Sequence, residues 1–370
     1  MQLDYEFPTH VILEKDGLAA HSELIAALGT NAMLVMDAGL DDAHPAKQEI
    51  LFCLDFNNIQ RTIYLHTRKI APGVANLEAG AALARESKVD FVIAVGCDAT
   101  LETGKGIALL AAQDIDNATL LNTNIAQPLP IVCIPTEPGS GTEVTPEIHV
   151  AQSGLDRLTL VRNPLAAPKL TFLDPRYTLL MPRDIVVSNY IKSLGRAMEA
   201  VASEKANPIS DAIAIAALGT ASELGARLSD PEVVLDETLH EQLMLAANQA
   251  GLAICASGAN LFEALASPLT YVTSEHLGQA YGLIIPPVLS YLIERAPLVS
   301  EVILQSLYFE GLEDLEDFLW DLIGEVVPIV ADDLERCTNA AMGNPLVKAS
   351  VLSLEFKEVA SCYAHLLAEE

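Results

Sequence analysis

The pattern of hydrophobic and polar residues changes near the middle of the chain. In the first half, short continuous apolar runs alternate with segments of helical periodicity. The apolar runs predict strands at 31–36, 60–65, 91–95 and 129–134, and the periodic segments predict helices at 22–28, 76–86 and 102–112. Asn76 is expected to cap the second of these helices. Strands alternating with helices predict a parallel sheet, and continuous apolar strands are typical of a sheet covered on both faces.

The second half carries almost no strand pattern. Long Ala- and Leu-rich periodic segments at 185–203, 211–228 and 237–257 predict helices instead. We therefore expect two domains, a nucleotide-binding α/β domain at 1–183 and an all-helical domain at 184–370. A cleft between the two domains is a favoured place for a ligand.

A polar segment follows the predicted strand at 129–134. Residues 135–145 read Pro-Thr-Glu-Pro-Gly-Ser-Gly-Thr-Glu-Val-Thr. Backbone N–H groups and hydroxyls after a buried strand meet at one edge of the sheet, where α/β proteins hold a phosphate or carboxylate. The alternative for a Gly-Ser-Gly sequence alone is an ordinary polar turn.

The net charge of −29 narrows the function classes. It argues against nucleic acid and anionic membranes as partners, because both need basic patches. No window has the composition expected of a membrane span, and no secretory signal is recognised at the start of the chain. The six cysteines form no Cys-x-x-Cys pair, which indicates free thiols and a cytoplasmic protein.

Several segments together resemble the iron-containing (group III) alcohol dehydrogenase family. They are residues 135–145 and the shorter segments at 7–11, 35–37, 169–177, 197–200, 206–212, 263–269 and 285–289. The resemblance implies the dehydroquinate synthase-like fold, a Rossmann-like parallel sheet followed by an all-helical domain. It also implies a homodimer, NAD(P)-dependent hydride transfer on alcohols or aldehydes, and a divalent metal between the domains.

The resemblance places a cofactor site on the first domain. The residues that it implies are Asp37, Gly96, Cys97, Asp98, Lys105, Thr136, Glu137, Ser140, Thr145 and Lys169. Asp98 stands where the family has a glycine of its phosphate turn, so its charge and Cβ impair phosphate binding unless it caps a helix beginning near Thr100. Asp37 favours NAD over NADP, because an acid at that strand end binds the ribose hydroxyl and repels a 2′-phosphate.

The metal site of the family is altered in this sequence. The four ligand places fall on Lys192, Arg196, Glu263 and Leu277, with His276 one residue away, and a further family His falls on Ser267. Cationic side chains cannot bind a divalent ion, so we expect no metal. We predict that Lys192 and Arg196 replace the charge of the ion and pair with Glu263. The alternative places both cations on a solvated helix face.

The sequence leaves three functions open. The first is a metal-independent oxidoreductase for a small alcohol, aldehyde or keto compound, anionic compounds included, with Lys192, Arg196, Glu263, Ser267 and His276 as candidate catalytic residues. The second is a non-catalytic paralogue that keeps the fold and dimer as a partner or regulatory protein. The third, a lyase of the dehydroquinate synthase kind, is weakened because it too needs a metal.

His149 is expected to be structural, with a proton-donating role as the alternative.

Overall fold

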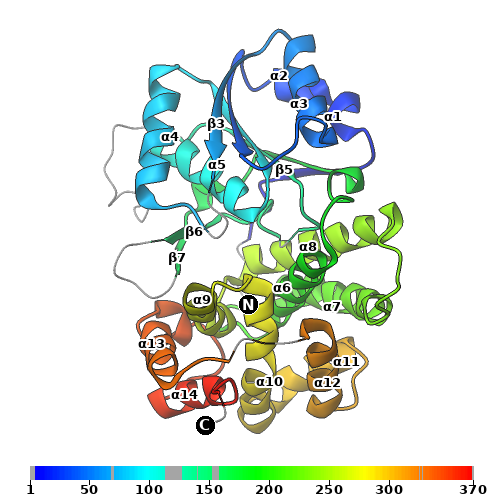
Figure 1. Ribbon diagram of the computed structural model, residues 1–370, viewed down its shortest axis with the longest axis vertical. Helices are drawn as coiled ribbons and strands as arrows, with labels where there is room; N and C mark the ends of the chain where they lie inside the picture. The colour runs from blue at the N-terminus through cyan, green and yellow to red at the C-terminus, as the bar shows by residue number, and fades with distance from the viewer. Residues whose placement is uncertain are drawn as a thin grey trace.

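The computed structural model describes residues 5–67, 71–112, 127–139, 141–151, 158–324, 326 and 328–368. A sheet flanked by helices forms the upper part of the molecule, and a group of helices forms the lower part (Figure 1). This is the fold class that the sequence predicts.

Six parallel strands form the main sheet. They are β1 (His10–Leu13), β2 (Asn31–Asp37), β3 (Gln60–His66), β4 (Phe91–Gly96), β5 (Ile131–Pro135) and β8 (Leu170–Leu173), in the order β1-β8-β5-β4-β2-β3. β4 and β5 are buried along their whole length, as their continuous apolar sequences predict. The chain moves from β2 outward to β3 and then returns to β4 on the other side of β2. The ends of β2 and β4 therefore flank the point where a doubly wound sheet usually binds its ligand.

Helices cover both faces of this sheet. α4 (Val74–Glu86) and α5 (Asp98–Ala111) share a core with one face. The short helices α1 (Gly17–Ala20) and α2 (Ser22–Ala26) pack with α3 (Pro45–Phe56) on the other face.

Two predicted helix starts are wrong. α4 begins after Gly73, so Asn76 lies in its first turn and donates its N–H to the Gly73 carbonyl. α5 begins at Asp98 with Cys97 as its N-cap, so Asp98 caps no helix near Thr100.

A two-stranded antiparallel sheet was not predicted from the sequence. β6 (Glu147–Ala151) pairs with β7 (Leu158–Arg162) below the main sheet, on the side of the helical part (Figure 1). Short 3-10 turns at Pro164–Ala166 and Pro175–Tyr177 flank β8. The pair matters because β6 carries Glu147 and His149 toward the helices.

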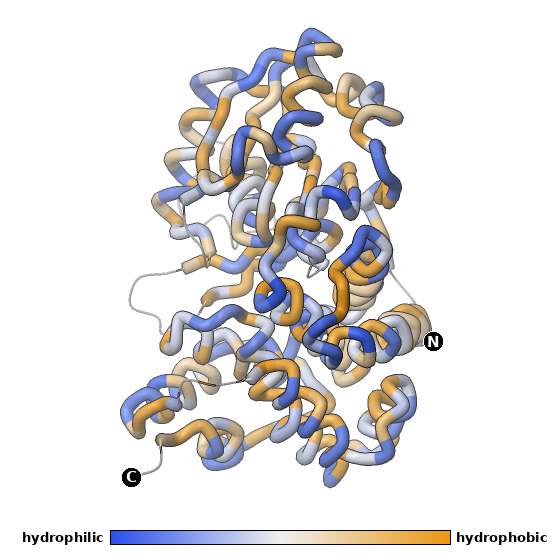
Figure 2. Tube along the Cα trace, turned by 45° about the vertical axis from the view of Figure 1, so that its right-hand side comes forward, coloured by the Kyte–Doolittle hydropathy of each residue, from blue (hydrophilic) through white to orange (hydrophobic). Residues whose placement is uncertain are grey.

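The helical part follows β8. Its α-helices are α6 (Arg183–Val201), α7 (Pro208–Leu228), α8 (Glu237–Ser257), α9 (Leu261–Thr273), α10 (Leu277–Arg295), α11 (Pro297–Ser306), α12 (Leu312–Ile323), α13 (Ala331–Met342) and α14 (Phe356–Ala364), with a 3-10 turn at Pro345–Lys348. They enclose one hydrophobic core. In Figure 2 hydrophobic and hydrophilic segments alternate along these helices, as expected for amphipathic helices around a core.

One helix has the composition of a membrane span, contrary to the expectation from the sequence. α7 is long and apolar enough to cross a bilayer. Its buried residues, among them Ala217, Leu218 and Leu224, belong to the hydrophobic core, and α7 packs against α6 and α8. Within the described residues, α7 therefore has the surroundings of a core helix.

Candidate functional site

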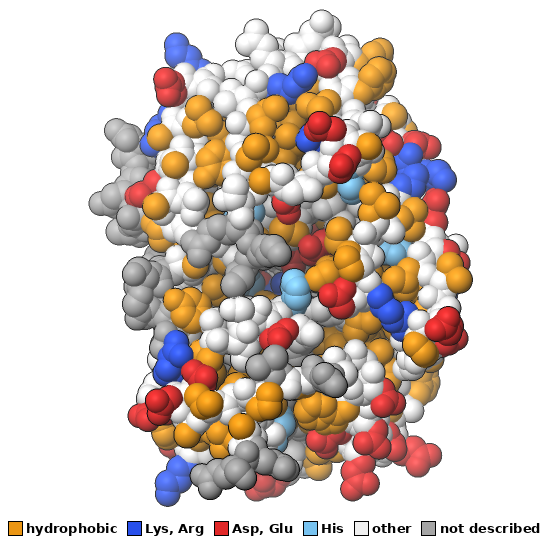
Figure 3. Space-filling view, viewed as in Figure 1, with side chains coloured by type: hydrophobic (Ala, Val, Ile, Leu, Met, Phe, Trp, Pro, Cys, Tyr) orange, Lys and Arg blue, Asp and Glu red, His pale blue; other side chains and the backbone are white. Residues whose placement is uncertain are grey.

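A cavity of about 260 Å³ lies where the sheet meets the helices. Its wall comes from the start of α5, from Glu137 after β5, from His149 on β6, and from α6, α9 and the segment before α10. Figure 3 shows acidic and histidine side chains gathered in a hollow near the middle of this face. The cavity is therefore polar and lies at the carboxyl end of the sheet, where the sequence predicts a ligand.

Two buried cations on α6 reach across to the α/β part. Lys192 and Arg196 are only 5% and 1% exposed, which rules out a solvated helix face. Lys192 Nζ lies 2.9 Å from Asp98 Oδ2, and Arg196 Nη2 lies 2.6 Å from Glu147 Oε2. The predicted pairing with Glu263 is thus wrong, because acids on α5 and β6 lie closer to the two cations. Asp98 points to α6 and is paired, which the sequence alone did not indicate.

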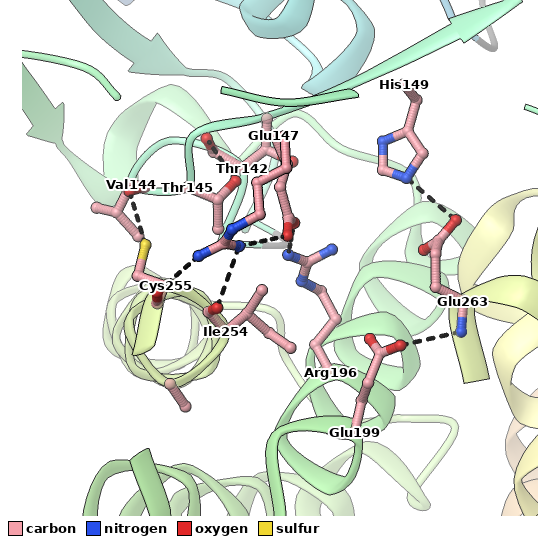
Figure 4. A network of polar contacts seen from close by, with 12 residues as sticks. Thr142, Val144, Thr145, Glu147, His149, Arg196, Glu199, Ile254, Cys255 and Glu263 are labelled. Carbon is pink, nitrogen blue, oxygen red and sulfur yellow. Dashed lines mark hydrogen bonds and ion pairs between the residues drawn. The ribbon is translucent and has the colours of Figure 1, made fainter. Parts of the chain in front are cut away.

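Glu263 pairs with His149 instead. His149 Nε2 lies 3.1 Å from Glu263 Oε1, and its Nδ1 lies 2.6 Å from Glu102 Oε1 (Figure 4 shows the first contact). Burial lowers the pKa of His149, but the two carboxylates outweigh this effect and raise the pKa to about 10. Burial opposes the charge on Glu263, yet His149 above all lowers the pKa of this carboxyl to about 2. The ring is therefore an imidazolium held between two carboxylates at neutral pH.

A second carboxyl lies behind Glu263. Tyr281 Oη lies 3.0 Å from Glu263 Oε2 and 3.0 Å from Glu199 Oε2. Burial and the charge of Glu263 raise the pKa of Glu199 to about 7. Because a hydroxyl has one hydrogen, Tyr281 donates to one carboxyl and accepts the proton of the other. The low pKa of Glu263 makes Glu199 the protonated partner.

Glu147 joins two arginines. Arg162 Nη1 lies 2.8 Å from Glu147 Oε1, and Arg162 also donates to the Cys255 carbonyl on α8 at 2.6 Å (Figure 4). Burial opposes the charge on Glu147, but Arg196 and then Arg162 lower its pKa. Arg196 Nε is buried and has no hydrogen-bond partner among the described residues. These contacts tie β6 and β7 to α6 and α8.

Several predicted cofactor residues meet at the carboxyl edge of the sheet. Asp37 ends β2, and its Oδ1 accepts the Gly39 N–H at 2.8 Å. Gly96 ends β4 with φ of +153°, and a Cβ there would lie 2.9 Å from Thr100. Cys97 is the N-cap residue of α5 but makes no side-chain capping hydrogen bond, and Thr136 donates its N–H to the Gly96 carbonyl at 3.0 Å. This edge is the place predicted for the cofactor.

Other predicted cofactor residues are Lys105, Lys169, Thr145 and Ser140. Lys105 is buried, and its ammonium donates to the carbonyls of Thr142, Thr145 and Glu147, so all three of its protons are used. Lys169 is exposed just before β8, at the amino end of the parallel strands and thus on the opposite edge. Thr145 is buried with its hydroxyl directed to the Thr142 carbonyl at 3.5 Å. Ser140 lies outside the described residues.

The remaining candidate catalytic residues occupy the helical wall. Ser267 lies one turn after Glu263 on α9, buried, and its hydroxyl has no partner among the described residues. His276 is exposed, lines the cavity and precedes α10. Glu137 lines the cavity too, and its Oε2 accepts from Asn189 Nδ2 at 3.1 Å. The structure thus places Glu137 in the same cavity wall as the candidate catalytic residues Lys192 and His276.

Comparison with known proteins shows which proteins this chain resembles. The profile described as iron-containing alcohol dehydrogenase matches residues 8–175. A probable alcohol dehydrogenase of Escherichia coli, EutG, is 29% identical over 226 residues, which cover 60% of this chain and 56% of EutG. The choline dehydrogenase of Bacillus subtilis is 28% identical over 366 residues, which cover 92% of this chain and 89% of that protein.

Residues 8–175 thus match the iron-containing alcohol dehydrogenase family, and a solved iron-containing alcohol dehydrogenase shares the fold with a TM-score of 0.91 at 24% identity over 99% of both chains. The match with EutG spans just over half the length of that relative. The fold agrees over whole chains. The sulfoacetaldehyde reductase of Bifidobacterium kashiwanohense, solved in complex with NAD⁺, has a TM-score of 0.84 at 20% identity and covers 100% of both chains.

The donor set at this site does not fit a divalent metal ion. Lys192 and Arg196 are cationic, and both are turned to carboxylates. Glu263 is already bonded to His149 and Tyr281. Among the described residues, no group of three His, Cys, Asp or Glu side chains is arranged to hold a metal. That the protein binds no metal stays a prediction.

Sequence reasoning missed most partners of the cations. The sequence did not indicate Glu147, Glu199 or Tyr281 as site residues, and His149 was expected to be structural, with proton donation as the alternative. One signal was available, since Glu147 and His149 are two residues apart and therefore share one face of a strand. Their partners on α6 and α9 come from distant sequence, and only the fold brings them together.

Proposed function

We propose that this chain is an NAD(P)-dependent oxidoreductase for a small alcohol, aldehyde or keto compound that works without a bound metal, as a homodimer. The buried Lys192 ammonium in the wall of the cavity carries the proposal. It lies on the α6 helix at a place that the family resemblance gives to a metal ligand. It also lies beside the start of α5, where we expect the cofactor.

The carboxyl ends of β2, β4 and β5 would hold the cofactor. Asp37 is placed to bind the adenosine ribose, and the turn at Gly96 leads into the uncapped start of α5, which attracts a phosphate. Lys192 offsets the charge that Asp98 brings to this turn. Bound NAD(H) supplies or accepts a hydride. The NAD⁺ complex of the sulfoacetaldehyde reductase supports this cofactor.

Lys192 provides the electrostatic part of the chemistry. Reduction of a carbonyl leaves negative charge on its oxygen, and a positioned ammonium stabilises that charge. Burial lowers the pKa of Lys192, but Asp98 outweighs burial, so the pKa is raised and the group stays charged. One ammonium proton binds Asp98, which leaves two for a substrate oxygen. The oxygen takes one proton from Lys192, which regains it from solvent, and alcohol oxidation reverses these steps.

The surrounding pairs hold Lys192 in position. His149 and Arg196 add positive charge near it without reaching solvent, because carboxylates on both sides of the cleft engage them. Both ring nitrogens of His149 are occupied, so its role is that of a fixed cation and not of a proton donor to substrate. We therefore assign Lys192 alone to proton transfer.

A non-catalytic paralogue is the second candidate, and one observation favours it. Lys192, Arg196 and His149 each already have a carboxylate partner, and Asp98 occupies the phosphate turn. Because carboxylates of this chain already pair with these cations, the cavity has less positive charge available to bind a cofactor phosphate. This alternative predicts that the protein binds no nicotinamide cofactor.

Titration calorimetry of the chelator-treated protein with NADH, and then NADPH, separates the two candidates. The oxidoreductase predicts saturation near one NADH per chain and weaker NADPH, followed by metal-independent turnover of a small aldehyde. Lys192→Met should then lower kcat by about 100-fold, the scale of one lost oxyanion donor or proton donor, with NADH still bound. Lys205→Met, an exposed control, should change nothing. Absence of cofactor binding would favour the paralogue.

A further inference from the structure

The cavity wall carries more acid than base. Its described acids are Asp98, Glu102, Glu137 and Glu275, and its described bases are Lys192, His149 and His276. The sequence suggested a cationic site suited to anionic substrates. The structure reverses that expectation, because the cations come with carboxylates that the resemblance alone did not place at the site.

The two cations of the wall are already neutralised. Lys192 is paired with Asp98. His149 is shared between Glu102 and Glu263, and Glu263 lies behind the wall. Glu137 and Glu275 therefore remain as surplus negative charge facing the cavity. A carboxylate-bearing substrate would meet repulsion from both.

Glu137 is the better placed of the two acids. Its Oε2 accepts a hydrogen bond from Asn189, and within the described part of the chain no Lys, Arg or His forms an ion pair with it. Asn189 and Lys192 are three residues apart on α6, which is about 4.5 Å along the helix axis. A negative group and the proposed oxyanion donor thus lie about one helical turn apart on the same wall.

We propose that this cavity selects a small alcohol or aldehyde that carries an ammonium group about three carbons from its oxygen. The inference rests on the proposed function, since it places the oxygen at Lys192 and the ammonium at Glu137. The described wall contains no aromatic side chain, so it lacks the cage that suits a quaternary ammonium. A primary ammonium, with three N–H donors, fits a carboxylate better.

Binding of such a ligand depends on pH through Glu137. Burial, followed by the charge of Asp98, raises the pKa of Glu137 to about 7, whereas Asn189 and Lys192 oppose that rise and Asp37 adds to it. An ammonium binds the carboxylate form, so affinity should increase as the pH rises through 7. A neutral alcohol of the same shape should show no such dependence.

The test compares three molecules of similar size in calorimetric titrations at pH 6 and pH 8, with the protein saturated with NADH. They are 3-aminopropan-1-ol, the neutral butan-1-ol and the anionic 3-hydroxypropanoate. At pH 8 we expect the amine to bind about tenfold more tightly than butan-1-ol and 3-hydroxypropanoate to bind most weakly. At pH 6 the advantage of the amine should shrink.

Variants assign the preference to one side chain. Glu137→Gln should abolish both the preference and its pH dependence, and Glu137→Asp should retain part of each. Glu241→Gln removes one exposed charge on α8, away from the cavity, and should behave like the parent.

The outcomes separate this inference from the proposed function. Tighter binding of butan-1-ol or 3-hydroxypropanoate to the NADH complex would overturn the substrate class and leave the oxidoreductase standing. Binding of the amine without any binding of NADH would support the substrate class and overturn the oxidoreductase. An unchanged preference in Glu137→Gln would overturn the role of Glu137.

Discussion

At the scale of single residues, the buried cations Lys192, Arg196 and His149 each have a carboxylate partner. Arg196 illustrates this best, because it is 1% exposed and its partner Glu147 is just as deeply buried. Removing one member of such a pair leaves an uncompensated charge in the interior, which costs more than the pair itself contributes. The site should therefore tolerate joint changes better than single ones.

Arg196→Met tests this balance. We expect a loss of about 3 kcal/mol in the free energy of unfolding, because Glu147 keeps only Arg162. Glu147→Gln combined with Arg196→Met should recover part of the loss. Urea unfolding of the two single variants and the double variant measures the coupling. Strictly additive losses would show that the pair does not act as a unit.

The sequence predicts residue roles only as far as local pattern and resemblance reach. It indicated that Lys192 and Arg196 replace metal ligands. It also predicted that both cations pair with Glu263, because Glu263 was the acid that the resemblance placed at the site. Asp98 was expected to impair phosphate binding, whereas its position on α5 opposite α6 makes it the partner of Lys192. Such pairings depend on how distant elements meet, which the sequence does not state.

At the scale of elements, the strands and helices were the easiest features to predict. Buried parallel strands are continuous apolar runs, so β2, β4 and β5 were recognised within a residue or two. β6 and β7 were missed. β6 contains Glu147 and His149, polar residues that are buried only because partners from the helical part reach them. Strand propensity therefore does not predict β6, because its polar residues belong to the site.

The contact between α6 and α10 depends on one glycine. A Cβ on Gly278 would lie 1.7 Å from the Ser188 carbonyl oxygen, so the two helix backbones touch there. Gly278→Ala should destabilise the protein by about 3 kcal/mol, because the helices must separate. Gly219→Ala on α7 is the matched control. No atom lies within 4 Å of its Cβ position, and the change should stabilise by up to about 1 kcal/mol. Thermal unfolding of both variants compares them, and equal melting temperatures would contradict the close approach.

At the scale of the whole molecule, the buried pairs join the α/β part to the helices. Lys192 and Arg196 cross from α6 to α5 and β6, and His149 crosses from β6 to α9. The α/β members of these pairs all precede the helical members in the sequence, so each pair joins residues from the two halves of the chain. The contact between the two parts therefore depends on the protonation states of these residues.

The pH dependence of stability follows from these states. The pKa of His149 is raised from 6.5 to about 10, so its contribution is complete below pH 6.5 and is lost as the pH rises through 10. The pKa of Glu263 is lowered from 4.5 to about 2, so its contribution is present above pH 4.5 and is lost as the pH falls through 2. Glu199 favours its protonated form up to about pH 7, and stability falls as the pH rises from 4.5 to 7.

Together these groups predict maximal stability near pH 5, with a decline toward pH 9. Urea unfolding at pH 5, 7 and 9 measures the profile. His149→Gln should flatten the decline above pH 6.5, and Glu199→Gln should flatten it between pH 4.5 and 7. A stability that rises from pH 5 to pH 9 would contradict the imidazolium between Glu102 and Glu263.

The pairing of Lys192 with Asp98 also has an evolutionary consequence. A lineage that has gained both charges loses stability when it exchanges one of them, since an acid at position 192 would face Asp98 and a neutral residue at position 98 would leave the ammonium unpaired. The same holds for Arg196 with Glu147. Single substitutions at either pair are therefore disfavoured, and drift in this protein should proceed by paired replacements across the cleft.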